Sequence, residues 1–392
     1  MLLEPLPYHV TVADILERAE PELWRWFRSD AFTKTYKAAT DKDLLRSAIR
    51  LERATDGSGP NERRYALAEQ ARDALGLSVP ITLFQMQDAA GAPNAFLVFT
   101  PGEIVIAFSG RILELLVTDA ELLDLLGHEI SHYKLFTEAE GRYHTVDRLL
   151  LWLIQRDNCP PEFLETWRRN KLYTEIYCDL GGLIACGDRD ATVRGLVKAI
   201  ADFKDADAES YLRQAKELLA KEPGATRGTT HPELHVRVLA IANAGMPREE
   251  FHTLLRPLIA GKIELGGLDL LDQQRLRDLT RAVLGRVLSD KTAASEEAVA
   301  HARQMFPDYQ LPAGPVPPLA KETTSLAASA IDYLAYLLLD LGAMDGTGSR
   351  AARAVAAQAA DELGIGARFR EVARLELKGR RSLLAGLTVK AA

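Results

Sequence analysis

Cysteine is scarce in this chain of 392 residues, which holds three: Cys159, Cys178 and Cys186. An odd and sparse set of this kind does not build the disulfide framework on which small extracellular domains depend. We therefore expect a reducing compartment. Cys178 and Cys186 are eight residues apart in an apolar stretch, and we expect them to be thiols of the core.

Long apolar runs are also missing. The longest are LLLWLI at 149–154 and YLAYLLL at 333–339, whereas a membrane-spanning helix needs about 20 predominantly apolar residues. The first twenty residues lack the basic stretch followed by an apolar segment that marks a secretory signal. We expect a cytoplasmic protein without a transmembrane segment.

Excess positive charge is absent as well. The formal net charge is −7, which argues against a general nucleic-acid-binding protein. Residues 350–392 differ, with nine Lys and Arg against four Asp and Glu. That surplus fits a helix with a solvated basic face, or a contact surface for an acidic partner or a lipid headgroup. Hydrophobic residues make up 47% of the chain, enough for a sizeable core.

Strand patterns are confined to one short part of the chain. Three runs rich in β-branched and aromatic residues stand between turn residues: ITLFQMQ (81–87), NAFLVFT (94–100) and EIVIAFSG (103–110). The Pro-Gly pair between the last two runs predicts a β-hairpin. The sequence therefore predicts a small β-sheet in a mainly helical protein.

Helical patterns fill most of the remaining sequence. Residues 11–55, 62–77 and 162–186 predict helices, and mostly helical sequence continues after them. The segment FPDYQLPAGPVPP (306–318) holds five prolines and is the best candidate for a linker. Beyond it, residues 322–385 predict a small helical module.

The segment LLGHEISHYK (125–134) places two histidines four residues apart. Residues i and i+4 share one face of a helix, so His128 and His132 can both point at one metal ion. Glu129 would lie beside them, close enough to take a proton from water that the metal activates. The preceding TDAE (118–121) has the pattern of a capping box, which predicts that a helix begins there.

A third ligand is needed, because catalytic zinc normally keeps three protein ligands and one open position. The segment YTEIYCDLGG (173–182) offers Glu175 and Asp179, again four residues apart. One carboxylate can complete the ligand set from a second helix, and the other can hold the second ring nitrogen of a histidine. Taken alone, the pattern better fits two surface acids of an amphipathic helix.

The order of five segments resembles the HtpX-like and CAAX prenyl protease family of zinc metallopeptidases, which are gluzincins. These segments are PNAF, SGRILELL, AELLDLLGHEISH, EIYCD and HPELHVR, within residues 62–245. The resemblance implies an α+β, predominantly helical fold, with a zincin-like metallopeptidase built on a small β-sheet and an active-site helix, and with a C-terminal helical module. Integral-membrane members carry spanning helices, which this sequence lacks. Cys178 stands where the family usually has alanine.

The resemblance also implies roles for individual residues around a Zn²⁺ ion. His128, His132 and Glu175 match the metal ligands. Glu129 matches the general base, and Asp179 matches the carboxylate that supports a ligand. The implied enzyme is a zinc-dependent endopeptidase that hydrolyses peptide bonds of a protein or peptide substrate.

Two further elements of the resemblance concern the substrate. His231 matches a donor to the developing oxyanion, and Arg237 matches a residue that positions His231 or the oxyanion. Without the family match, His231 would be taken as a surface histidine before a proline. An edge strand of the sheet pairs with the extended substrate in zincins. The strand residues expected to do so are Asn94, Ala95, Phe96, Leu97 and Val98.

We expect four parts along the chain. They are an N-terminal helical extension (1–60), the zincin-like metallopeptidase domain (61–260), a helical connector (261–312) and the C-terminal helical module (320–392). The module weakly resembles the TerB-type helical domain of tellurite resistance, on the pattern of residues 337–365, and could recruit a protein partner.

Two other functions stay open at this point. One is a non-catalytic interaction or scaffold protein on a peptidase fold, against which the complete set of His128, Glu129, His132 and Glu175 argues. The other is an aminopeptidase. That activity needs an acidic anchor for the free amine of the substrate, which the sequence cannot identify.

Overall fold

The computed structural model divides into two compact units, Met1–Gly261 and Lys262–Ala392. The residues that it describes are 2–32, 34, 47–54, 58–87, 91–221, 224–314, 316–344 and 350–377. Most of 33–46, in the predicted N-terminal helical stretch, and 378–392, at the end of the predicted C-terminal module, lie outside the described residues.

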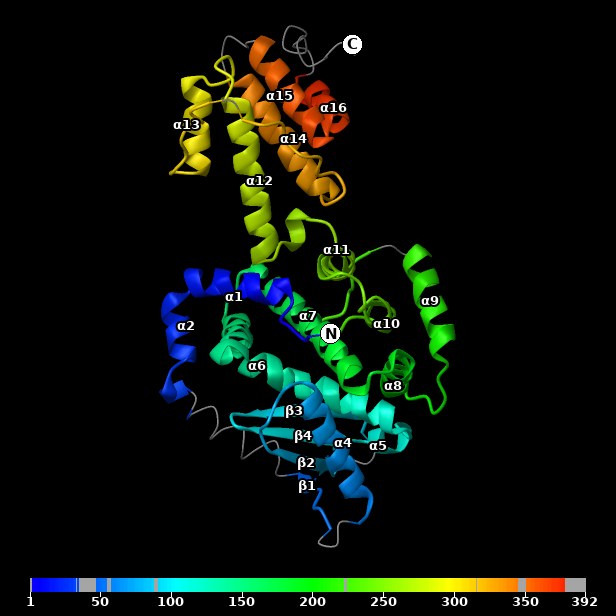
Figure 1. The fold of residues 1–392 in the computed structure, drawn as a ribbon. Coiled ribbons are helices and arrows are strands. Elements are labelled where there is room, and N and C mark those ends of the chain that lie inside the picture. Colours follow the sequence, from blue (N-terminus) through cyan, green and yellow to red (C-terminus); the bar gives the residue numbers. More distant parts are fainter. Residues whose placement is uncertain are drawn as a thin grey trace. The chain divides into compact units, whose positions relative to one another are not determined.

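The described part of the first unit contains a four-stranded sheet in the order β1-β2-β4-β3 (Figure 1). The strands are β1 (Ala48–Arg50), β2 (Ile81–Met86), β3 (Asn94–Thr100) and β4 (Glu103–Ser109). The predicted hairpin is confirmed, because β3 pairs antiparallel with β4, with Leu97 opposite Ile106. β2 runs parallel to β4. β3 is therefore an edge strand of this sheet.

β1 shows that the prediction of helix across residues 11–55 is wrong at its end. Ala48–Arg50 pairs antiparallel with β2, while α1 (Pro7–Ala19) and α2 (Pro21–Phe27) are the named helices in the described part of that stretch. Ile49 is 56% exposed, so this short strand buries no apolar face of its own. It forms because β2 offers backbone hydrogen-bond partners, which a local pattern cannot reveal.

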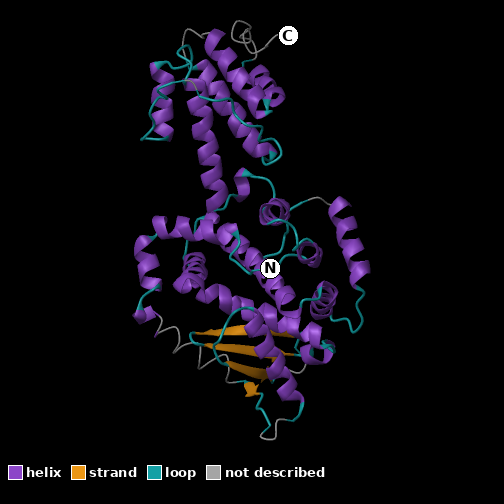
Figure 2. Ribbon diagram, in the orientation of Figure 1, coloured by secondary structure: helices purple, strands orange, loops and turns teal. Residues whose placement is uncertain are grey.

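The rest of the first unit is helical, and Figure 2 shows its strands confined to the one small sheet. The helices after β1 are α4 (Pro60–Ala74), α5 (Ile112–Leu115), α6 (Asp119–Ile154), α7 (Pro161–Cys186), α8 (Arg189–Ala201), α9 (Ala208–Lys221), α10 (Leu234–Ala242) and α11 (Arg248–Ile259). This composition agrees with the predicted α+β, mainly helical class. Across the described residues, every helix is too short or too polar to cross a membrane.

α6 begins where the capping box predicts. The backbone N–H of Glu121 donates to Thr118 Oγ1 at 3.2 Å, and the N–H of Thr118 donates to Glu121 Oε2 at 3.4 Å. The backbone leaves helical geometry between Glu138 and Gly141, where the last three residues have positive φ. The first half of α6 lies beside β3 in Figure 1.

α6 and α7 approach closely because glycines line their crossing. A Cβ atom at Gly127 would lie 2.5 Å from the Cβ of Ala185, and one at Gly182 would lie 2.5 Å from Asp124 Oδ1. Larger residues at these positions would push the helices apart. Because the helices approach closely at these glycines, His128, which follows Gly127 on α6, lies opposite the middle of α7.

α1 is tied to α7 through His9, which is 1% exposed. The backbone N–H of Leu6 donates to His9 Nδ1 at 3.2 Å, and His9 Nε2 lies 3.3 Å from Thr174 Oγ1. The Thr174 hydroxyl donates to the carbonyl of Asn170 at 2.8 Å. His9 Nδ1 is therefore an acceptor, so the ring is neutral. Burial lowers the pKa of His9 to about 3.

Acid is expected to destabilise the first unit through His9. The unfolded chain binds a proton at this residue with a pKa of about 6.5, whereas the folded ring stays neutral down to about 3. The stabilisation is therefore complete above pH 6.5 and is lost as the pH falls toward 3. Between pH 7 and 5.5 the wild type should lose about 1 kcal/mol more unfolding free energy than His9→Gln. Urea titrations at both pH values measure this, and equal losses would contradict it.

The second unit contains a helical bundle. Its elements are the 3₁₀ helix η1 (Leu265–Gly267) and the helices α12 (Leu270–Leu288), α13 (Glu296–Met305), α14 (Ala328–Ala343), α15 (Arg350–Leu363) and α16 (Gly366–Glu376). Residues of these helices, such as Leu334, Leu338 and Phe369, share one core. The proline-rich segment predicted as a linker contributes Phe306 and Tyr309 to this core, each 7% exposed. It packs within the unit because both aromatic side chains are buried there.

Candidate metal centre

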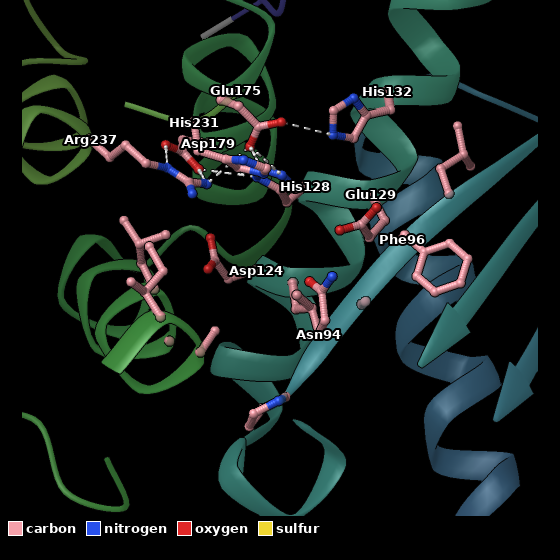
Figure 3. A pocket seen from close by; sticks show the side chains of 18 of the residues that line it. Asn94, Phe96, Asp124, His128, Glu129, His132, Glu175, Asp179, His231 and Arg237 are labelled. Carbon is pink, nitrogen blue, oxygen red and sulfur yellow. Dashed lines mark hydrogen bonds and ion pairs between the residues drawn. The ribbon is translucent and has the colours of Figure 1, made fainter. Parts of the chain in front are cut away.

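A cleft of about 440 Å³ opens in the first unit between β3, α6, α7, α8 and the segment before α10. Figure 3 shows that the predicted site residues converge there from these separate elements. Those that line it are Asn94, Ala95, Phe96, Leu97, His128, Glu129, His132, Glu175, Asp179, His231 and Arg237. Val98, also predicted to bind substrate, is 2% exposed and is not part of the lining.

Two imidazole rings of α6 face one carboxylate of α7. His128 Nε2 lies 3.5 Å from Glu175 Oε2, and His132 Nε2 lies 3.7 Å from Glu175 Oε1. The ring centroids of the two histidines are 5.2 Å apart. The i, i+4 spacing thus puts both rings on one face, and the close crossing of the helices brings Glu175 to that face.

Glu175 Oε2 is buried and has no hydrogen-bond partner among the described residues. Buried polar atoms are nearly always hydrogen-bonded, so an orphaned carboxylate oxygen needs another explanation. This oxygen lies 3.5 Å from His128 Nε2, 3.4 Å from His231 Nε2 and 3.6 Å from Arg237 Nη2, and none of these nitrogens hydrogen-bonds to it. Two histidine nitrogens and one carboxylate oxygen are a donor set that zinc accepts in catalytic sites. The residues fit a divalent metal.

The electrostatics of the two histidines agree with this fit. Burial lowers the pKa of His132 to about 4, so the ring is neutral at pH 7 and one of its nitrogens can bind a metal. For His128, burial also opposes a positive charge, but Asp179 and Glu175 outweigh it and raise the pKa to about 10. The two carboxylates therefore favour a cation beside this ring, be it a proton or a metal ion.

Cys178 is a second candidate for the third ligand. Its Sγ and nitrogens of His128 and His132 lie within 4.8 Å of one another. A thiol binds metal as the thiolate, and burial raises the pKa of Cys178 well above its usual value. The Glu175 carboxylate is different: burial raises its pKa, but His128, His132 and Arg237 more than compensate and hold it well below the usual range. Glu175 is therefore the better candidate for the third ligand.

Asp179 and Arg237 form a buried ion pair behind His128. Arg237 donates from Nε to Asp179 Oδ2 at 2.8 Å and from Nη2 to Oδ1 at 2.6 Å. Asp179 Oδ1 also lies 3.1 Å from His128 Nδ1, so Nδ1 can donate to it and leave Nε2 for a metal. Arg237 is 5% exposed. Its guanidinium is thus occupied with a carboxylate and is not directed at His231.

Glu129 lies beside the two histidines, yet its carboxylate turns toward β3. It is 5% exposed and accepts a hydrogen bond from the backbone of Leu97. Burial, with a smaller contribution from Glu175, raises its pKa to about 7. A carboxylate with a pKa near neutrality can both accept and return a proton.

His231 stands at the rim of the cleft, in the segment before α10. Its side chain is 59% exposed, and its Nε2 lies 3.4 Å from Glu175 Oε2. Its Nδ1 lies 2.9 Å from Thr230 Oγ1. The ring therefore lies next to Glu175 while more than half of the side chain stays exposed.

Part of the lining was not predicted from the sequence. Leu196, Ala199 and Ile200 of α8 border the cleft, and so does Asp124 of α6. Asp124 precedes His128 by four residues, so the same i, i+4 rule that pairs the histidines could have placed it on their face. The α8 residues carry no comparable signal, since their apolar pattern is that of any packed helix.

Comparison with protein families finds that residues 60–157 match peptidase family M48. The matched span runs from α4 through β2, β3 and β4 and the whole of α6, and it includes His128, Glu129 and His132 but ends before Glu175. The match supports the M48 metallopeptidase family and thereby a hydrolase with a protein or peptide substrate. No curated protein and no solved structure shows significant similarity to the chain.

Proposed function

We propose that this protein, whose residues 60–157 match peptidase family M48, is a zinc-dependent endopeptidase. The observation that carries the proposal is the convergence of His128, His132 and the orphaned Glu175 oxygen beside Glu129 in one cleft. Zinc would be held by His128, His132 and Glu175. A zinc ion there supplies Lewis-acid activation of water and of the scissile carbonyl.

Glu129 would do the proton transfer. Its carboxylate takes the proton of the attacking water and later gives it to the leaving amine. Its side chain lines the cleft together with the two histidines. This assignment needs a group that is close to the metal ligands but binds no metal itself, and Glu129 has that position.

His231 would donate to the oxyanion that forms on the scissile carbonyl, because its exposed ring stands over the ligands. We assign Arg237 a positioning role: its two hydrogen bonds hold Asp179, which in turn orients His128. The free edge of β3 at Asn94–Leu97 would pair with the extended substrate. A strand-like substrate lying along this edge passes through the cleft, which favours internal cleavage over removal of one terminal residue.

Further expectations from the sequence stay predictions. Residues 61–260 would be the metallopeptidase domain, and residues 320–392 would be the TerB-like module that binds any protein partner. The cytoplasmic location and the scaffold alternative also stay predictions. Turnover of an unstructured protein by purified, metal-loaded enzyme separates the scaffold alternative from the peptidase.

We expect one zinc per chain, and substitution of Glu175 tests the ligand set. Glu175→Ala should lower zinc content to well below 0.5 per chain, because two histidines alone hold zinc weakly. The matched control is Cys178→Ala, which removes the other nearby donor from the same helix. Zinc measured by elemental analysis after dialysis should stay near one in this control. The reverse result, with zinc lost only in Cys178→Ala, would make the thiolate the third ligand.

A further inference from the structure

Asp124 is a buried acid for which the proposed mechanism has no use. It is 8% exposed and lines the cleft. Figure 3 shows its carboxylate on the far side of His128 from His132. Glycines make room for it, since a Cβ at Gly182 would lie 2.5 Å from Oδ1 and one at Gly195 would lie 3.3 Å from Oδ2.

The charge of Asp124 is not balanced by an ion pair within the described residues. Its direct partner is the Thr192 hydroxyl, while His128 and Arg237 act on it only as charges at longer range. Burial and the like charge of Asp179 raise its pKa to about 7. The neighbouring acid on the same helix is different, because Lys198 Nζ lies 2.8 and 3.0 Å from the two carboxylate oxygens of Glu121. A buried carboxylate without a cation is costly unless a cation arrives.

Besides Asp124, the cleft has apolar lining residues, namely Leu116, Leu125, Leu196, Ala199 and Ile200. Leu116 and Leu196 are buried, and Ile200 is half exposed. Apolar walls together with a carboxylate that has no ion pair complement a long side chain that has a methylene stem and a charged end.

We propose that Asp124 determines substrate specificity by binding the ammonium or guanidinium group of a lysine or arginine side chain next to the scissile bond. The side chain enters between α6 and α8, from the substrate residue that lies at the Asn94 end of β3. An apolar side chain in the same place would leave the carboxylate without a cation. This proposal rests on the proposed peptidase function and names its substrate class.

The test uses peptides that differ in one residue. Each is acetylated and amidated, so the only variable cation is a side chain. Lysine, norleucine or glutamate is placed in turn at three positions on each side of the cleavage site. Norleucine has a similar apolar chain and no ammonium group. The zinc-loaded wild type is compared with Asp124→Asn, which has nearly the same shape, and with Asp119→Asn, a change to an exposed acid of α6 outside the cleft.

At one position, kcat/KM of the wild type should be about 10–100-fold higher for lysine than for norleucine, the range of a charged hydrogen bond. Asp124→Asn should bring this ratio to about one and leave norleucine turnover within about 3-fold. Asp119→Asn should keep the wild-type ratio. No lysine preference at any position would overturn the proposal. An equal loss for both peptides would also overturn it, and would make Asp124 a positioning residue of the metal centre.

Binding separates this proposal from the peptidase proposal. Fluorescence anisotropy of the same peptides, labelled, is measured on Glu129→Gln with and without Asp124→Asn. Lysine-selective binding that Asp124→Asn abolishes, with no cleavage by the wild type, would sink the peptidase proposal and leave the lysine site. Cleavage by the wild type without a preference for lysine would overturn the lysine site and leave the peptidase proposal. Dependence on Asp124 that appears only with a free N-terminal amine would make Asp124 the anchor of an aminopeptidase and overturn our assignment.

Discussion

Turnover is expected to fall by about 10²–10⁴-fold when Glu129 is replaced by glutamine, with zinc content unchanged. The amide keeps the size of the side chain and its place in the cleft, but it cannot accept a proton from water. Glu129 is 5% exposed and receives its hydrogen bond from the backbone of Leu97. A pKa near 7 suits the assigned task, because the group must accept a proton and release it in one catalytic cycle.

The measurement is kcat on an unstructured protein, with zinc determined on the same sample. The matched control is Glu138→Gln, which neutralises an acid of α6 that pairs with Lys134 outside the cleft. We expect this control to retain wild-type turnover. Substantial turnover by zinc-loaded Glu129→Gln would remove the general-base assignment. Loss of zinc from that variant would instead indicate that Glu129 helps to hold the metal.

Replacement of His231 by phenylalanine is expected to lower kcat by about 10²–10³-fold, as loss of an oxyanion donor does. The ring stands at the rim, with Nε2 3.4 Å from Glu175 Oε2 and more than half of the side chain exposed. A group that contacts only the developing oxyanion stabilises the transition state and leaves the ground state unchanged. KM should therefore change little.

His235 provides the control for this substitution, because it follows His231 by four residues and does not line the cleft. His235→Phe should keep both kcat and KM close to the wild-type values. The decisive comparison is the split between the two constants in His231→Phe. A higher KM with an unchanged kcat would make His231 a residue that binds substrate.

Local patterns predicted several elements because their signals act within a few residues. The capping box at Thr118 and Glu121 starts α6 as expected, and the hairpin of β3 and β4 pairs around its Pro-Gly turn. The expected helix over 11–55 failed at β1, because that strand depends on pairing with β2. Val98 differs from Asn94–Leu97 in that its side chain is 2% exposed and does not line the cleft.

The sequence by itself determined which residues can share a helix face. The spacing of His128 and His132, and that of Glu175 and Asp179, is a property of the chain and holds in any α-helix. Only the tertiary structure decided that these faces meet, since the approach of α6 to α7 depends on contacts such as Gly127 against Ala185. Those contacts join residues more than fifty positions apart, beyond the reach of a local pattern.

The candidate metal ligands could be predicted from the sequence, whereas the specificity proposal depends on the tertiary structure. The HExxH motif can be recognised in the sequence alone, because the chemistry needs its two histidines and its glutamate at that spacing on one helix. The role of Arg237 and the surroundings of Asp124 depend on how four helices pack: Arg237 of α10 is held by Asp179 of α7, and Asp124 of α6 lines one cleft with residues of α8. The partners and the pKa of a carboxylate or a guanidinium depend on how it is buried. Burial is a property of the packed structure and cannot be read from the order of residues.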